Sequence, residues 1–152
     1  MQENFGLIRV FKKYIQHTPK NAIVPNIKIF FCLLTKTVIR VMNLKTQRVY
    51  ITSRMLKHLY DKRTAEEFDF FLYNTKEIIS YPDHIYKNKE SKRGQFLLVK
   101  KLKENLYVCS LEIINFCTPE EENQLATYFR IRPDYLKNYT RLWSWENGGP
   151  PS

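Results

Sequence analysis

Hydrophobic and polar positions follow two different periods along this chain of 152 residues. Apolar residues first recur every three to four positions, which is typical of amphipathic helices. This helical spacing occupies three stretches, residues 5–15, 53–63 and 64–81. Strand patterns with a period of two follow in residues 85–87, 95–102, 106–114 and 124–132. Helices before strands, with short links between the strands, predict an α+β fold in which N-terminal helices pack on one face of a four-stranded, or slightly larger, antiparallel sheet.

The first third of the chain is more ambiguous. Residues 27–34 and 37–42 are rich in Ile, Val, Phe and Thr, a composition typical of strands. The turn-like residues 43–47 then predict that 38–42 and 48–52 pair as a hairpin. We therefore divide the chain into three parts. These are a basic N-terminal extension (1–47, a short helix plus strands), a main domain (48–146) and a flexible tail (147–152).

Local signals mark the ends of three helices. Ser53 can cap the first helix of the main domain, and Thr64 with Glu67 forms a capping box for the second, which Pro82 ends. A further short helix is expected after Pro133. Its apolar positions are Tyr135, Leu136, Tyr139 and Leu142.

The charge of the chain favours a polyanionic partner. The formal net charge is +10 and the isoelectric point is near 9.5, which favours nucleic acid first and an anionic membrane surface second. Residues 1–53 carry nine basic and one acidic residue, net +8, and residues 84–105 carry seven and two, net +5. This uneven distribution is what a one-sided binding surface requires.

Other compositional features narrow the class of protein. The longest apolar run, Ile29–Leu34, is far shorter than the roughly 20 residues of a membrane span, and residues 1–26 do not resemble a signal peptide. We therefore expect a cytoplasmic protein without a membrane span. The three cysteines match neither a disulfide framework nor a zinc site, and we expect all of them to be buried inert thiols. They are Cys32, Cys109 and Cys117.

One histidine lies among fixed positive charges. His58 follows Lys57, and Lys62 lies four residues further along the same predicted helix. RNA can be cut without a metal if one group takes the 2′-hydroxyl proton, another protonates the leaving oxygen and cations hold the phosphate. Histidine suits either proton transfer at neutral pH. The alternative is that Lys57 is solvated and His58 is a packing residue.

Two further groups of residues can bind nucleic acid. In the strand 124–132, alternation places Tyr128, Arg130 and Arg132 on one exposed face, where they can stack a base and grip phosphates. The alternative is a solvated edge. Thr127 alternates with the apolar set, which predicts a packing role. The second group is a basic loop and strand tip that can steer RNA or simply keep the protein soluble. It consists of Lys87, Lys89, Lys92, Arg93, Lys100, Lys101 and Lys103.

Common catalytic motifs are missing from the sequence. It contains no glycine-rich phosphate loop, no His-Glu-x-x-His and no Cys-x-x-Cys, so nucleotide hydrolysis and zinc catalysis have no support. A Cys-His nucleophile made of Cys109 and His84 is disfavoured because Cys109 has no cationic neighbour in sequence. We expect neither a metal nor a cofactor.

Three short motifs follow one another along the chain: the helix start Tyr-Ile-Thr-Ser with Leu-Lys-His (50–58), Tyr-Pro-Asp (81–83) and Leu-Ala-Thr-Tyr-Phe (125–129). In these motifs and in the order of its elements, the chain from residue 49 to residue 145 resembles small nucleases of the barnase, EndoU, colicin and RelE superfamily, especially the phage-encoded and colicin D-like branch. This resemblance implies catalytic roles for Lys57 and His58, and it places Thr127 at the scissile phosphate with Phe129 beside it. A lysine expected two residues before the Lys-His pair is Met55 here. Residues 1–48 have no counterpart.

These features lead to the hypothesis of a metal-independent endoribonuclease. His58 would be the general acid or base, Lys57 and Arg130 would stabilise the phosphorane, and Thr127 would orient the phosphate. The RNA strand would be bound by Lys62, Tyr128, Arg132, Lys89, Lys92, Arg93, Lys100 and Lys101. The resemblance implies a toxin-like enzyme that cuts tRNA or mRNA and has a neutralising antitoxin or immunity protein. The expected ends are a 2′,3′-cyclic phosphate and a 5′-hydroxyl. The alternatives are a non-catalytic nucleic-acid-binding protein and a protein-interaction module.

Overall fold

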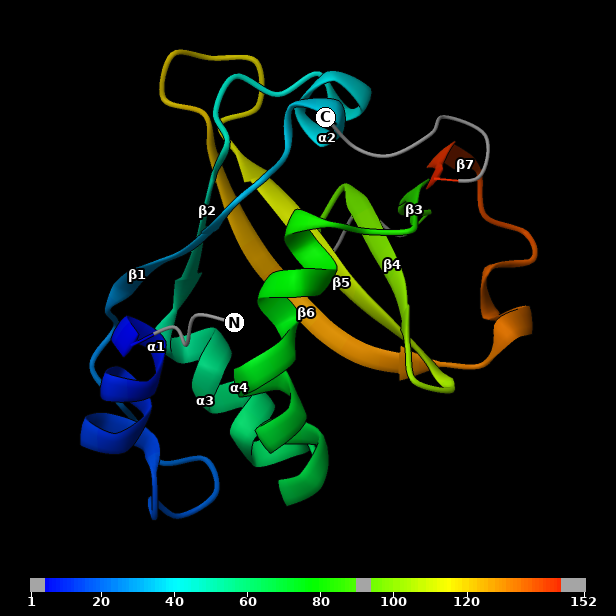
Figure 1. Cartoon of the computed structure of the whole chain (residues 1–152). Coiled ribbons are helices and arrows are strands. Elements are labelled where there is room, and N and C mark those ends of the chain that lie inside the picture. Colours follow the sequence, from blue (N-terminus) through cyan, green and yellow to red (C-terminus); the bar gives the residue numbers. More distant parts are fainter. Residues whose placement is uncertain (1–4, 90–93, 146–152) are drawn as a thin grey trace.

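A computed structural model describes residues 5–89 and 94–145 of the chain. The fold is α+β, with the helices gathered on one side of a seven-stranded sheet (Figure 1). The strand order is β1-β2-β6-β5-β4-β3-β7. β2 and β6 run parallel, and every other neighbouring pair is antiparallel. The predicted fold class is therefore confirmed, whereas the sheet is larger than four strands and is mixed.

The elements follow one another in the order helices, strand, helix, strand, two helices and five strands. They are α1 (Phe5–Val10), the π-helical turn η1 (Phe11–Ile15), β1 (Lys28–Leu33), α2 (Lys36–Met42), β2 (Arg48–Thr52), α3 (Ser53–Lys62), α4 (Ala65–Ser80), β3 (His84–Lys87), β4 (Phe96–Leu102), β5 (Asn105–Ile114), β6 (Glu122–Ile131), the 3-10 turn η2 (Pro133–Leu136) and β7 (Arg141–Ser144). No helix within the described ranges is long and apolar enough to cross a membrane.

The segment before β2 differs from the predicted hairpin. β1 pairs antiparallel with β2, and residues 36–42 form the helix α2 instead of a strand. Thr35 caps α2 by accepting a hydrogen bond from the Val38 N–H, and Asn43 ends the helix in the left-handed conformation at φ 54°. Caps at both ends, with tertiary packing, outweigh the modest strand preference of valine and isoleucine.

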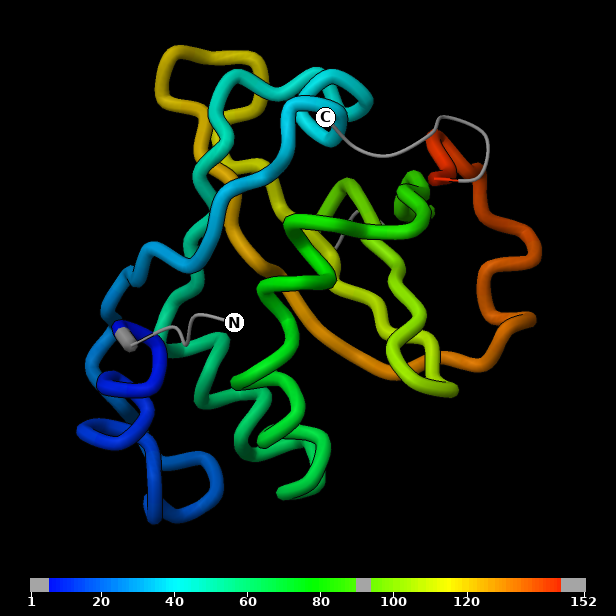
Figure 2. The backbone as a smooth tube through the Cα atoms, in the orientation of Figure 1, coloured from blue at the N-terminus to red at the C-terminus, as the bar shows by residue number. Residues whose placement is uncertain are grey.

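The N-terminal residues share the main core with the rest of the chain. Leu7 and Ile15 are fully buried in the same hydrophobic cluster as Phe71 of α4 and Ile51 of β2. In Figure 2 the N-terminal segment runs beside α3, at the β1 edge of the sheet. Residues 5–33 therefore complete the helix layer and the sheet edge.

The α4 helix begins where the capping box predicts. The Thr64 hydroxyl accepts a hydrogen bond from the Glu67 N–H at 3.1 Å, and the Glu67 carboxylate accepts one from that hydroxyl at 3.2 Å. Phe68, Phe71 and Ile78 then face the sheet as the apolar period predicts. This helix covers the centre of one sheet face.

A bulge in β6 sets which side chains face the helices. Ser110 pairs with Thr127 and Leu111 with Leu125, which leaves Ala126 as an extra residue. Leu125 and Tyr128, three positions apart, both join the core beneath the helices. For the residues of 124–132 that follow the bulge, the predicted assignment of side chains to the two faces of the sheet is therefore wrong.

The opposite sheet face carries a smaller core. Leu97, Val99 and Val108 pack there against Leu136 of η2. The predicted helix after Pro133 is only this one 3-10 turn, and Leu142 belongs instead to β7, which pairs with β3. The predicted tail, residues 147–152, lies outside the described residues.

The cysteines meet the expectation only in part. Cys32 and Cys109 are buried, and burial raises the pKa of the Cys32 thiol to about 12. Burial also raises the pKa of Cys109 well above its usual value. Cys117 lies exposed in the turn between β5 and β6, so the prediction that it is buried is wrong.

Candidate active site

His58 lines a pocket of about 380 Å³ between the start of α3 and the face of β5 and β6. Its lining includes three kinds of chemically useful residue: a histidine (His58), an arginine (Arg54) and a glutamate (Glu112). The full lining is Thr52, Arg54, Met55, His58, Glu112, Gln124, Leu125 and Ala126.

The path of the chain from β2 into α3 positions Arg54 and His58. β2 is paired with β6 only at Val49 and Tyr50, and the chain turns into α3 as soon as the strand ends. Thr52 caps the helix by accepting a hydrogen bond from the Met55 N–H at 3.2 Å. Arg54 and His58 are four residues apart and therefore lie on one face of α3. That face lines the pocket.

The sheet supplies the acidic side. Glu112 of β5 and Gln124 of β6 are partners in the antiparallel register. Their neighbours Leu111, Ile113 and Leu125 lie in the core beneath the helices, so alternation directs Glu112 and Gln124 to the opposite face. The pocket is therefore lined both by α3 and by two residues of the sheet face that the helices do not cover.

Sequence reasoning missed both Arg54 and Glu112. Arg54 had a usable signal, because it lies one helical turn before His58. Glu112 is a single charged position in an otherwise apolar strand. That pattern indicates a solvent-facing residue, but it does not reveal which helix lies beside it.

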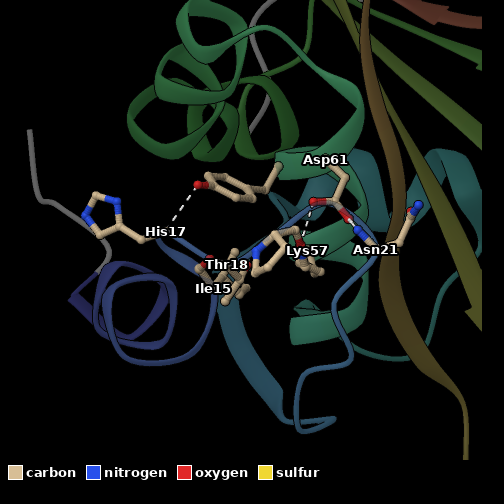
Figure 3. Close-up of polar contacts among 8 residues, drawn as sticks. Ile15, His17, Thr18, Asn21, Lys57 and Asp61 are labelled. Atoms are coloured by element: carbon tan, nitrogen blue, oxygen red, sulfur yellow. Dashed lines mark hydrogen bonds and ion pairs between the residues drawn. The ribbon is translucent and has the colours of Figure 1, made fainter.

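The structure places Lys57 away from this pocket. Its ammonium lies 2.6 Å from Asp61 Oδ1 and donates to the Pro19 carbonyl at 2.8 Å (Figure 3). The side chain is only 6% exposed. Consecutive residues on a helix point about 100° apart, so Lys57 points away from the pocket that His58 lines. The expectation that Lys57 contacts the phosphate is therefore not supported.

This ion pair anchors the N-terminal segment to α3. Asp61 Oδ2 accepts the N–H of Asn21 at 3.0 Å, and the N–H of His17 donates to the Tyr60 hydroxyl at 3.2 Å (Figure 3). Burial alone would raise the pKa of Asp61. Hydrogen bonds from Lys57 and Asn21, with the charges of Lys57 and Lys20, nevertheless lower it below its usual value. Lys57 is a structural residue in this arrangement.

Tyr128 is buried, so the predicted base-stacking role is wrong. It is 0% exposed and lies between Phe71 and Tyr107, with ring centroids at 5.2 and 6.1 Å. Burial also raises the pKa of its hydroxyl. Among the described residues that hydroxyl has no hydrogen-bond partner.

Removing this hydroxyl is expected to stabilise the fold. An unpaired buried polar group costs about 1–3 kcal/mol. We therefore expect Tyr128→Phe to raise the free energy of unfolding by about 1 kcal/mol in a urea titration. Tyr128→Leu, which also removes the ring contacts, should instead lower it. A loss of stability in Tyr128→Phe would show that the hydroxyl is satisfied in solution.

Thr127 lies on the same sheet face as Glu112 and Gln124. It is buried, in agreement with the predicted packing role, and it is opposite Ser110 in the register. Within the described part of the chain, neither hydroxyl has a hydrogen-bond partner. Thr127 follows Ala126, which lines the pocket, so it lies beside the pocket and not in its wall.

The two predicted arginines lie at the other end of β6. Arg130 is four residues beyond Ala126, which is about 13 Å along a strand. Arg130 and Arg132 line a separate pocket of about 500 Å³, where β5 begins and β6 ends. Arg130 is therefore not beside His58, and the expectation that it shares the reaction centre is not supported by its position.

The predicted basic residues are distributed over several surfaces. Lys62 is exposed at the end of α3, and Lys101 is exposed on β4. Lys89 lies over the Tyr139 ring at 4.9 Å, and Lys100 donates to the Tyr81 carbonyl at 2.8 Å and lies 3.4 Å from Asp83. Lys92 and Arg93 lie outside the described residues.

Comparison with models of protein families, with curated proteins and with solved structures gives no significant match. Within the described ranges, no three His, Cys, Asp or Glu side chains are arranged to hold a metal ion.

Proposed function

We propose that this chain is a metal-independent endoribonuclease whose reaction centre is the His58 pocket. One observation carries the proposal: an imidazole, a guanidinium and a carboxylate line a single pocket. These are the three kinds of group that cleavage of RNA by its own 2′-hydroxyl requires, namely a base, an acid and a fixed cation.

In the proposed reaction, one side chain removes a proton from the RNA and another donates a proton to it. The Glu112 carboxylate takes the proton of the 2′-hydroxyl, and the 2′-oxygen attacks the adjacent phosphorus. The bond from phosphorus to the 5′-oxygen breaks, and His58 in its protonated form gives that oxygen a proton. The Arg54 guanidinium stabilises the charge on the pentavalent phosphorus centre. The products are a 2′,3′-cyclic phosphate and a 5′-hydroxyl.

Arg54 also offers a replacement for a lysine that the family pattern contains and this chain lacks. Where a lysine is expected two residues before the Lys-His pair, this chain has Met55, which lines the same pocket as Arg54. The neighbouring Arg54 can supply the cation that this lysine would otherwise provide. Lys57 matches the sequence pattern of the family, but its ammonium forms an ion pair with Asp61.

Cleavage in EDTA tests the proposal. Purified protein is incubated with tRNA, with single-stranded RNA and with the same RNA carrying 2′-deoxy substitutions. We expect cleavage of the unmodified RNAs to 5′-hydroxyl ends and no cleavage at 2′-deoxy positions. Products with 5′-phosphate ends, or strict dependence on added Mg²⁺, would contradict the mechanism. Retention of RNA with a steep salt dependence but no scission would indicate the non-catalytic alternative.

A further inference from the structure

Two aromatic rings and two cations form a platform on the sheet face that carries the pocket. The platform consists of Lys28 and Phe30 of β1 with Arg48 and Tyr50 of β2. The Phe30 and Tyr50 rings meet edge to face at 6.0 Å. Phe30 is 40% exposed and Tyr50 is half-buried, so both rings have surface that a ligand can reach.

The cations lie against these rings. Arg48 Cζ is 4.3 Å from the centre of the Phe30 ring, and Arg48 Nε donates to the Tyr50 hydroxyl at 3.0 Å. Lys28 Nζ lies 4.9 Å from the centre of the Tyr50 ring and pairs with Glu122 at 2.6 Å. The platform therefore presents flat surfaces together with the positive charge of Arg48, whereas Lys28 is neutralised by Glu122.

The sheet register connects the platform to the pocket. Phe30 is opposite Tyr50, Tyr50 is opposite Gln124, and Gln124 is opposite Glu112. The four positions form one row across β1, β2, β6 and β5. Neighbouring strands are about 4.8 Å apart, so the row spans about 14 Å. A single extended ligand can reach from the Phe30 ring to the pocket.

Unpaired nucleotides are the ligand that this surface fits. Aromatic rings and guanidinium planes stack on the open faces of unpaired bases, and nearby cations attract the phosphates. In a duplex those base faces are already stacked on each other. An apolar protein segment would instead remove the Arg48 guanidinium from water without compensating its charge, whereas Lys28 already has Glu122 as its partner. The chain's formal charge of +10 also favours a polyanion.

We propose that this platform is a base-stacking subsite for an unpaired nucleotide that flanks the scissile phosphate in the His58 pocket. The inference rests on the proposed endoribonuclease function and adds a substrate class to it: single-stranded RNA long enough to occupy both places. The enzyme then cleaves single-stranded RNA in preference to duplex RNA, since a paired base cannot stack on Phe30.

Binding tests the platform independently of cleavage. A short single-stranded oligonucleotide with 2′-O-methyl groups is titrated against the protein by fluorescence anisotropy, because it lacks the attacking hydroxyl. We expect Phe30→Ala to raise the Kd about tenfold. Phe30→Trp, which keeps a stacking surface, should bind within about threefold of the unchanged protein. Tyr73→Ala is the control, because Tyr73 is 44% exposed on α4 in the helix layer, and its Kd should not change.

Cleavage assays separate the two proposals. If the platform is a subsite, Phe30→Ala should lower kcat/KM about tenfold for a longer single-stranded RNA and leave cleavage of a dinucleotide unchanged. Equal binding by Phe30→Ala and Tyr73→Ala would overturn the platform even if the protein cuts RNA. Conversely, weaker binding by Phe30→Ala without any RNA cleavage would support the platform and contradict the proposed enzyme.

Discussion

Replacing His58 with asparagine is expected to lower the rate of RNA cleavage in EDTA by at least about a hundredfold. Acid or base catalysis by a positioned side chain contributes typically about 10²–10⁴ in rate, and an amide cannot transfer the proton. Asparagine and histidine have similar helix preferences, so α3 should persist. The measurement is the initial rate on a single-stranded RNA under conditions where the unchanged protein is saturated.

A second histidine provides the matched control. His17 is exposed and adopts a left-handed backbone conformation at φ 68°, which asparagine tolerates well. We expect His17→Asn to cleave RNA at the unchanged rate. A His58→Asn protein that keeps a normal thermal unfolding midpoint and still cuts RNA at the normal rate would show that the imidazole takes no part in the reaction.

The parts of the fold that local signals determine could be predicted from the sequence. The Thr64 and Glu67 cap and the long apolar period of residues 64–81 identify α4, and a mostly apolar run that follows a turn identifies β5. The α2 segment could not be recognised from its composition. There, Val and Ile favour a strand by a small margin, and the caps at Thr35 and Asn43 outweigh that preference.

The candidate site depended on features that are not local. The bulge at Ala126 shifts the phase of β6, so Tyr128 faces the core although simple alternation predicts an exposed ring. Lys57 pairs with Asp61 one helical turn away, but its second partner, the Pro19 carbonyl, is 38 residues distant. Similarly, whether Arg54 and Glu112 line the same pocket depends on how α3 packs beside β5 and β6. His58 was identifiable because it sits on an amphipathic helix among cations.

Replacing Lys57 with methionine is expected to lower the free energy of unfolding by about 3–5 kcal/mol at neutral pH. Removing one partner of a buried ion pair leaves the other charge without compensation, and this costs more than the pair itself contributes. Asp61 would remain with its side chain 8% exposed and would keep only the Asn21 N–H as a donor among its described partners. Urea titrations of the variant and the unchanged protein provide the measurement.

The pH dependence identifies the cause of this loss. The pKa of Asp61 in the fold is below its unfolded value, so its stabilising contribution is fully present above the unfolded pKa of about 4. That contribution is lost as the pH falls through the folded pKa. In Lys57→Met, burial instead favours the protonated carboxyl, and acid relieves the unpaired charge. The difference in stability between the two proteins should therefore be largest near pH 7 and should shrink below about pH 4.

Two further variants distinguish the ion pair from lysine removal in general. Lys62→Met changes an exposed lysine of the same helix and should shift the free energy of unfolding by no more than about 0.5 kcal/mol. Adding Asp61→Asn to Lys57→Met should recover part of the loss, because the amide oxygen still accepts the Asn21 N–H and carries no charge. If Lys57→Met matches Lys62→Met at pH 7, the ion pair adds nothing measurable to stability. The other contacts of the N-terminal segment, including the Asn21 N–H to Asp61 and the His17 N–H to Tyr60, then suffice to hold it on α3.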